Sequence, residues 1–208
     1  MDKEVQELQA RLQYRFSDLA LLSQALTHAS ASNARQPSNE RLEFLGDAIV
    51  GLVVSEHLYL RFPEASEGQM TRIKSAVVSR RTLARVGRSL GLPQCLRVDS
   101  GLKQRKRYPV SLAANAYEAV VGAMLLDRGI AAASEFIVRT LGPEIALVVS
   151  GRHEWDYKTI LQLKAQAQGK PPPQYEVARR TGPDHRGRFM TVVCIDGEEC
   201  GSGWGTTK

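Results

Sequence analysis

The sequence predicts an all-α domain over residues 1–150 and a small α+β domain over residues 156–208. Up to about Ser150 the apolar residues recur at helical spacing, with little alternation between apolar and polar positions. Beyond Asp156, one helical segment is followed by the run Pro171–Pro173 and then by three short alternating segments typical of strands. A chain of 208 residues has room for one large domain and one small one.

Capping signals mark the helices of the first domain. Ser66 and Gln69 have the spacing of a capping box, in which the two side chains satisfy free backbone N–H groups at a helix start. Glycine after a periodic segment favours a helix end. The helices are therefore expected to begin near Ser17, Ser66, Ser79 and Ser111, and two of them to end at Gly91 and Gly129.

The second domain begins after a polar boundary segment at residues 151–155. Asp156 can N-cap a helix that ends at Gly169, because the prolines that follow forbid its continuation. Turn-forming residues then separate the segments that we expect to be strands, which are residues 174–181, 188–195 and 199–206.

Basic residues are concentrated in the middle of the chain. The net charge is +6, but the segment from Gly68 to Arg107 alone holds eleven Lys or Arg residues against one acid, Asp99. A solvated surface would explain a short basic run, whereas this density favours binding of a phosphate-rich partner.

The cysteines and the apolar segments indicate a location. Cys95, Cys194 and Cys200 are odd in number and have no metal-ligand spacing, so they predict neither a disulfide framework nor a zinc site. The first residues lack an apolar signal segment, and no stretch approaches eighteen uncharged apolar residues. We expect a protein of the reducing cytoplasm with no membrane association.

One helix carries a row of acids. At 100° per residue, Glu40, Glu43 and Asp47 fall at about 0°, 300° and 340°, so the three carboxylates share one face. Such a face is often solvated, but eight uncharged residues follow Asp47 and indicate an enclosed helix. Neighbouring like charges then need a cation, and oxygen ligands favour Mg²⁺, with Mn²⁺ as a substitute. The apolar stripe expected to face the core lies opposite the acids and comprises Leu42, Leu45, Ile49, Leu52 and Val53.

A second polar pair stands in an apolar helix. Asn115 and Glu118 are three residues apart and face the same way, so they could complete a metal site or form a structural hydrogen bond between helices. His28 and His57 could move protons, although single histidines in apolar segments are more often structural.

The acidic helix and the segments around it resemble a known family. The run NERLEFLGDAIV at residues 39–50, with ALTHAS before it and SLAANAYEAVVGAMLLD after it, resembles the signature of the ribonuclease III family. The segments DYKTILQ, QYEV and GPDH resemble a double-stranded-RNA-binding domain of the α-β-β-β-α type. The resemblance implies an endonuclease domain over residues 1–150 and a double-stranded-RNA-binding domain over residues 156–208 that lacks its last helix and leaves apolar strand residues exposed.

The resemblance also implies an activity. We expect an enzyme that hydrolyses double-stranded RNA with a divalent metal and leaves 5′-phosphate and 3′-hydroxyl ends with short 3′ overhangs. Processing of ribosomal RNA precursors and other structured RNAs would be its role, and a homodimer its working form. The metal ligands would be Glu43, Asp47, Asn115 and Glu118, with Asp47, Glu118, Glu40 and Glu67 in the catalytic acidic valley. Asn115 departs from the family's usual Asp and could weaken metal binding.

The remaining expected contacts lie outside the acids. Phe44 is off the core stripe, so it would either fill a pocket of a partner chain or pack locally. The resemblance assigns RNA binding to Gln162, Gln166, Pro183, His185 and Lys208. Without it, the two glutamines would be ordinary exposed positions.

Two other functions would fit parts of the sequence. A non-catalytic RNA-binding protein that keeps the fold would be expected to lose acids, and Asn115 is one such loss. A glycosidase with a carboxylate pair gives no role to the basic segment. The endonuclease explains both the acids and the basic residues.

Overall fold

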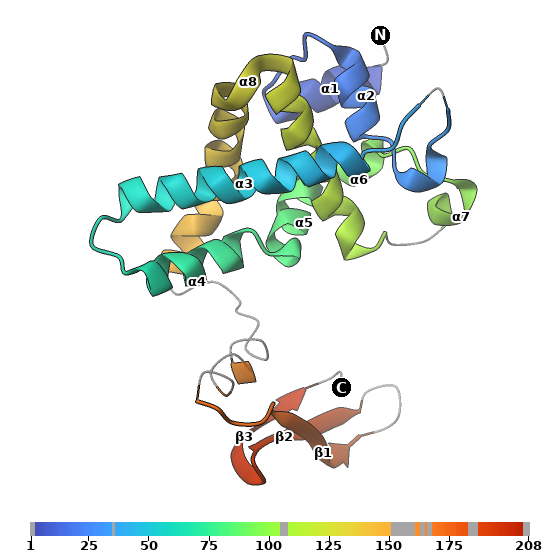
Figure 1. Ribbon diagram of the computed structural model, residues 1–208. Coiled ribbons are helices and arrows are strands. Elements are labelled where there is room, and N and C mark those ends of the chain that lie inside the picture. The colour runs from blue at the N-terminus through green and yellow to red at the C-terminus, as the bar shows by residue number, and fades with distance from the viewer. Residues whose placement is uncertain are drawn as a thin grey trace. The chain divides into compact units, whose positions relative to one another are not determined.

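The computed structural model describes residues 3–34, 36–104, 108–150, 161–162, 165, 168–182 and 187–205. The chain divides into two compact units, Met1–His153 and Glu154–Lys208. The described part of the first unit is helical and that of the second is mainly a sheet (Figure 1). An all-α unit followed by a small unit with three strands is the fold class that the sequence predicted.

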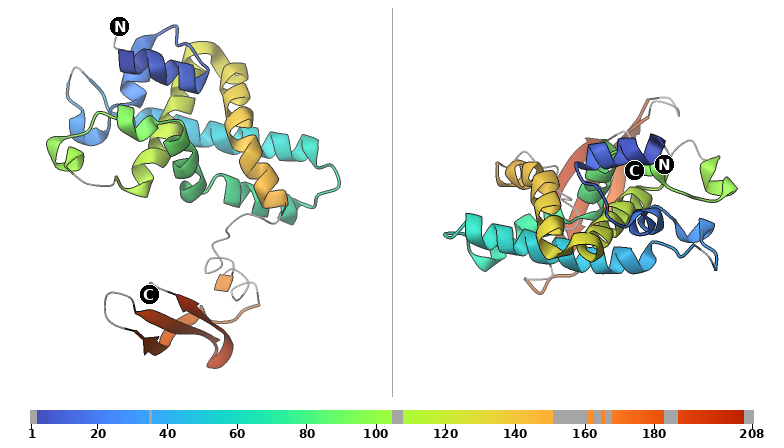
Figure 2. Two further views of the ribbon diagram at one scale, coloured as in Figure 1. Left: turned by 180° about the vertical axis from the view of Figure 1, so that it is seen from behind. Right: turned by 90° about the horizontal axis from the view of Figure 1, so that it is seen from above.

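The first unit is built around α8, whose two helical segments meet at a bend near Gly129 and of which the first runs through the middle of the unit (Figures 1 and 2). α8 packs against α2, α3, α4, α5 and α6, and its first half is buried on nearly all sides, from Leu112 to Met124. The elements of this unit are α1 Lys3–Leu12, α2 Leu19–Ala25, the 3-10 turn η1 Ala29–Ala31, α3 Glu40–Arg61, α4 Glu67–Val77, α5 Arg80–Ser89, α6 Leu92–Cys95, α7 Ser100–Lys103 and α8 Val110–Val149.

Glycine allows α3 and α5 to approach α8 closely. A Cβ on Gly122 of α8 would overlap the backbone carbonyl of Leu42 on α3. A Cβ on Gly87 of α5 would likewise overlap the carbonyl of Ala113 on α8. Residues without a side chain at these crossings let the helix backbones touch, and this holds the three helices in fixed positions.

Most helix ends follow the sequence signals. Ser66 and Gln69 form the predicted capping box at the start of α4, and the Ser79 side chain caps α5. α2 differs slightly, because Asp18 and not Ser17 caps it. Gly129 lies at φ 79° and, with Arg128, has a non-helical backbone, so the predicted helix end at Gly129 is confirmed and α8 consists of two helical segments that meet there.

Asp127 ties the N-terminal segment to α8. Its carboxylate is 1% exposed and accepts hydrogen bonds from the backbone N–H groups of Ser17 (3.0 Å) and Asp18 (2.8 Å) and from the Tyr14 hydroxyl (2.8 Å). Burial alone would raise the pKa of Asp127, but these donors and the charge of Arg128 outweigh it and lower the pKa.

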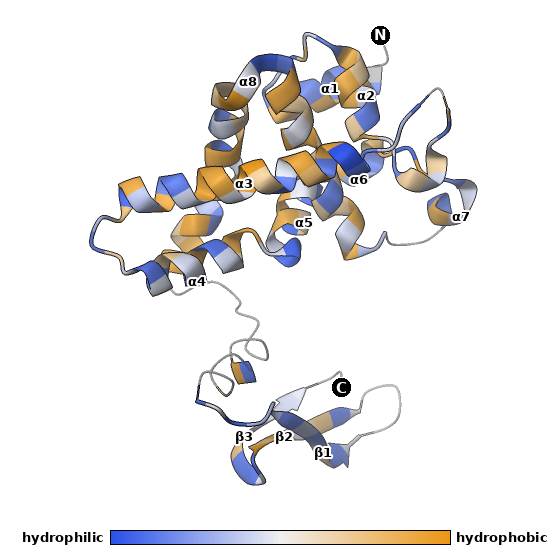
Figure 3. Cartoon of the chain, viewed as in Figure 1, coloured by the Kyte–Doolittle hydropathy of each residue, from blue (hydrophilic) through white to orange (hydrophobic). Residues whose placement is uncertain are grey.

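The buried side of α3 differs from the predicted stripe. Leu42 and Val53 are buried as expected, but Leu52 is 57% exposed, and Leu45 and Ile49 are half-buried. Gly46 and Val50 are buried in their place. The core therefore begins beside the row of acids and not opposite it, because the helix turns its glycine toward α8. In Figure 3 the start of α3, which carries the first acids, is strongly hydrophilic, and its middle is apolar.

The second unit contains an antiparallel sheet in the order β1-β2-β3. Two strands match the predicted bounds, and the third starts one residue earlier than predicted. Tyr175, Val177 and Trp204 are exposed apolar residues of this sheet, in line with the expectation. Of the preceding helix, Leu161, Gln162 and Ala165 are described as helical, and its predicted N-cap, Asp156, lies outside the described residues. The strands are β1 Gln174–Thr181, β2 Arg188–Ile195 and β3 Glu198–Gly205.

Candidate active site

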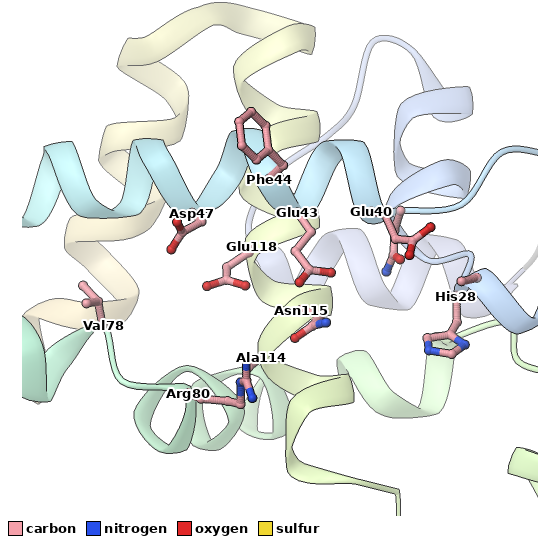
Figure 4. A pocket seen from close by; sticks show the side chains of 12 residues that line it. His28, Glu40, Glu43, Phe44, Asp47, Val78, Arg80, Ala114, Asn115 and Glu118 are labelled. Carbon is pink, nitrogen blue, oxygen red and sulfur yellow. The ribbon is translucent and has the colours of Figure 1, made fainter. Parts of the chain in front are cut away.

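A pocket of about 640 Å³ opens where α3, the start of α5 and the first half of α8 meet. Most of its lining side chains are polar, and the acids among them point into it (Figure 4). The pocket is lined by His28, Ala29, Asn39, Glu40, Glu43, Phe44, Asp47, Val78, Arg80, Ala114, Asn115 and Glu118.

The two acidic helices meet in this pocket as the sequence predicted. α3 contributes Glu40, Glu43 and Asp47, and α8 contributes Asn115 and Glu118. The close approach of Gly46 to the Glu118 backbone brings the two rows together. Four carboxylates and the amide of Asn115 thus share a single pocket.

Burial and mutual repulsion perturb two of these acids. Burial, followed by the charges of Asp47 and Glu43, raises the pKa of Glu118 to about 7, while Arg80 works in the opposite direction. Burial also raises the pKa of Glu43 most strongly, against a hydrogen bond from Asn115, with Glu40 and Asp47 adding to the rise. The pocket therefore concentrates more negative charge than its own cations neutralise.

Hydrogen bonds hold some of these side chains. Asn115 donates to the carboxylate of Glu43. The Ser38 hydroxyl donates to Oε2 of Glu40 at 2.8 Å. Asn115 therefore forms a hydrogen bond between α8 and α3, which is one of the two roles that the sequence left open for it, and positions an acid of the pocket.

The donors of this pocket suit a hard cation. Carboxylate and amide oxygens are the ligands that Mg²⁺ prefers, and burial, together with the neighbouring carboxylates, raises the pKa values of Glu43 and Glu118. In the part of the chain that the structure describes, no three His, Cys, Asp or Glu side chains lie close enough together to form a finished metal site. The residues thus fit a divalent cation in type and place, and binding one would require the carboxylates to draw together.

Glu67 is not brought into this pocket. It is the first residue of α4, accepts a hydrogen bond from Thr71 at 2.7 Å, and lines a separate depression with Leu52 and Tyr59. Within one chain, the expected acidic valley therefore consists of the other four acids. Neighbourhood in the sequence does not fix the direction in which α4 presents its first turn, and a role of Glu67 in cleavage or in a dimer contact stays a prediction.

Two further side chains line the pocket, namely Arg80, which the sequence placed only in the basic run, and His28, which the sequence offered as a residue that could move protons. Arg80 is the first residue of α5. Ser79, which caps this helix, was the local signal in the sequence that the helix begins there. His28 belongs to a tight turn, where Nδ1 accepts the backbone N–H of Ser30 at 3.1 Å, so that in the neutral ring Nε2 carries the proton. His57 lies on α3 outside the pocket.

Of the residues expected to contact a partner chain or RNA, the structure describes only some. Phe44 is one of the lining residues, and its side chain is 81% exposed, which excludes local core packing. Gln162 is exposed on a helical segment. Gln166, Pro183, His185 and Lys208 lie outside the described residues.

No helix among the described residues is both long enough and apolar enough to span a bilayer. The cysteines Cys95, Cys194 and Cys200 are free thiols.

A helical unit with a carboxylate-lined pocket, followed by a small unit with a three-stranded sheet, defines the class of nucleases that act on double-stranded RNA. Comparison with known proteins agrees. Residues 18–145 match the family model Ribonuclease-III-like, and residues 157–208 match the double-stranded RNA binding motif. The chain belongs to the ribonuclease III family, whose members are endoribonucleases specific for double-stranded RNA and generally use a divalent metal.

Individual relatives extend over nearly the whole chain. Ribonuclease 3 of Rhodopirellula baltica is 42% identical over 205 residues, covering 99% of this chain and 77% of that protein. Ribonuclease 3 of Symbiobacterium thermophilum is 43% identical over 199 residues, covering 95% of this chain and 85% of that protein. A solved nuclease domain of ribonuclease III from Campylobacter jejuni, reported with a flexible region involved in dimer formation, superimposes with a TM-score of 0.63 at 33% identity. It covers 67% of this chain and 96% of that one.

Proposed function

We propose that this chain cleaves double-stranded RNA by hydrolysis of phosphodiester bonds at the pocket between α3 and α8, leaving 5′-phosphate and 3′-hydroxyl ends with short 3′ overhangs. The observation that carries the proposal is the meeting of Glu43, Asp47 and Glu118 in one pocket with pKa values of Glu43 and Glu118 raised by burial and by neighbouring carboxylates. Acids that served only the structure would be expected to form salt bridges with basic side chains of the protein.

Glu43, Asp47, Asn115 and Glu118 would hold Mg²⁺, with Mn²⁺ as a substitute. A divalent ion bound there supplies a Lewis acid that lowers the pKa of water and offsets charge on the phosphate. The side chains orient the reaction: Glu118 and Asp47 face the centre of the pocket, and Asn115 keeps the Glu43 carboxylate turned inward. Glu40, held by Ser38, extends the acidic lining along the pocket toward His28.

The second unit would deliver the duplex. A-form RNA presents 2′-hydroxyl groups in a shallow minor groove, and side chains that both donate and accept suit that surface. We assign this contact to Gln162 and Gln166, and add Pro183, His185 and Lys208 from the loop and the C-terminal residues. The natural substrates would be ribosomal RNA precursors and other structured RNAs in the cytoplasm, where free thiols such as those of this chain persist.

A homodimer is the proposed working form, with Phe44 filling a pocket of the second chain. Its large exposed ring is typical of an interface anchor. Glu67 could join an acidic pocket only across such an interface, since it lies apart from the pocket of its own chain.

The test is cleavage of a long duplex RNA by the purified chain with Mg²⁺, with and without a chelator. Glu118→Gln should abolish cleavage and leave RNA binding, measured with Ca²⁺ in place of Mg²⁺, nearly unchanged. Glu135→Gln is the matched control, because Glu135 is an exposed acid of the same helix outside the pocket. Equal cleavage by the Glu118 variant and the native chain would refute the assignment of the site.

A second candidate function is RNA binding without catalysis. Asn115 favours it, because an amide stands where a further acid would strengthen metal binding. A folded, dimeric preparation that binds duplex RNA but never cuts it in Mg²⁺ or Mn²⁺ would establish this alternative.

A further inference from the structure

Arg80 is the one permanently charged cation among the residues that line the described pocket. It is the first residue of α5 and lies across the pocket from Glu43 and Glu118 (Figure 4). The electrostatic influence of its guanidinium reaches both acids. The side chain is exposed, so the guanidinium is accessible from solvent.

The position of Arg80 has no explanation in helix stability. A positive charge in the first turn of a helix is repelled by the partial positive charge of the helix N-terminus. Across the described residues, no salt bridge joins Arg80 to an acid, whereas Arg85 of the same helix is paired with the largely buried Glu144. The Arg80 guanidinium is therefore held near the acids without being bound to them.

We propose that Arg80 binds a backbone phosphate of the RNA duplex when that duplex lies in the acidic pocket; the inference rests on the proposed function. The carboxylates of the pocket repel phosphate, so a cation of the protein that stands beside the metal ligands favours the entry of the substrate. A guanidinium presents paired N–H donors that match two phosphate oxygens. Arg80 is thus a substrate-binding residue of this chain, in addition to the acids.

A structural alternative gives different results. If Arg80 acts as an internal counter-ion for Glu43 and Glu118, its removal changes the electrostatics of the acids and their demand for a metal. RNA affinity and its salt dependence would then stay the same. If Arg80 binds phosphate, its removal takes one charge contact from the RNA complex.

The experiment measures binding of a duplex RNA to the full chain in Ca²⁺ over a series of salt concentrations. Arg80→Gln should weaken binding about tenfold, as expected for one lost charge-assisted contact, and should reduce the slope of log affinity against log salt by about one. Arg80→Lys should keep the slope and lose part of the affinity, because ammonium retains the charge but not the paired donors. Arg61→Gln, an exposed arginine at the end of α3 outside the pocket, should change neither quantity.

Two results would overturn the inference. Arg80→Gln could bind RNA with native affinity and slope, whatever its Mg²⁺ requirement, which would establish the counter-ion alternative. Arg80→Gln could also match Arg80→Lys in slope, which would show that charge at this position is not felt by the RNA. Binding is measured without cleavage, so the assay can detect the phosphate contact of Arg80 even if the native chain proves to be inactive. The proposal of cleavage and the proposal of phosphate binding can therefore be refuted independently. Circular dichroism of each variant verifies the fold.

Discussion

The backbone of Gly46 on α3 touches the backbone carbonyl of Glu118 on α8, and a Cβ added to Gly46 would overlap that oxygen. The contact lies between the two acidic rows, because Asp47 follows Gly46 directly and Glu118 is itself one of the acids. The spacing of the carboxylates therefore depends on a residue that has no side chain. A glycine of this kind belongs to the site as much as the acids do, since it sets how closely they can approach a common ion.

Gly46→Ala should destabilise the nuclease unit and reduce cleavage. The added methyl group must push α3 away from α8, which costs about 1–3 kcal/mol of unfolding free energy and separates Asp47 from Glu118. Urea unfolding and cleavage rates measure the two effects. Gly51→Ala is the control on the same helix, because its Cβ would meet only the end of Lys74 at 3.9 Å and should stabilise the helix by about 0.5–1 kcal/mol. Native activity in Gly46→Ala would show that the acids tolerate a wider spacing.

The raised pKa of Glu118 makes stability depend on pH when no metal is bound. Its pKa of about 7 in the folded chain lies above the usual value of 4.5, so the folded state holds the proton more tightly than the unfolded state. The resulting stability is fully present below pH 4.5 and is lost as the pH rises to about 7. The unfolding free energy of the native chain should therefore fall between about pH 5 and pH 8 by more than that of Glu118→Gln. The difference should be about 1 kcal/mol after allowance for solvent screening.

The measurement is urea unfolding of both chains at the two pH values in a chelator. Added Mg²⁺ should reduce or reverse the advantage of the variant, because the ionised carboxylate then gains a cation. Unfolding curves of the two chains that shift in parallel with pH would contradict the assigned titration of Glu118.

Asn115→Asp should lower the Mg²⁺ concentration that supports half-maximal cleavage. The change gives the proposed ligand set a fourth carboxylate, in addition to Glu43, Asp47 and Glu118. The added charge should raise the metal affinity about tenfold. In a chelator the same change should destabilise the chain, because it adds like charge and removes the hydrogen bond that Asn115 donates to Glu43. Gln104→Glu adds an equal charge at an exposed position outside the pocket and should alter neither quantity. An unchanged Mg²⁺ midpoint would mean that position 115 does not contact the metal.

Local chemistry made much of this fold predictable. The capping box of Ser66 and Gln69 and the strands β1 and β2 appear where the sequence placed them, because caps and alternation act within a few residues. Helical periodicity likewise predicted that Glu40, Glu43 and Asp47 would share a face.

Tertiary contacts determined what the sequence did not predict. The core side of α3 is turned toward Gly46 and Val50, which leaves Leu52 exposed, because glycine permits a closer approach of α8 than leucine does. Glu67 was expected beside the other acids and lies elsewhere, and Arg80 was counted in the basic run without being placed in the pocket. Each of these depends on how separate helices cross, which periodicity within one helix does not encode.

Phe44→Ala should weaken self-association without weakening the fold. The ring is 81% exposed in the single chain, so its removal takes away almost no buried apolar surface and should leave the unfolding free energy of the monomer unchanged. An interface anchor of this size should instead raise the dimer dissociation constant at least about tenfold, as measured by sedimentation equilibrium. Leu147→Ala, an exposed apolar residue near the end of α8, is the control and should leave association as it is. Because Phe44 is one of the residues that line the acidic pocket, a dimer formed through its ring would bring the second chain close to that pocket. The variant should then lose cleavage at low protein concentration and regain it as the concentration rises. A variant that is dimeric at every concentration would remove Phe44 from the interface and leave its exposure unexplained.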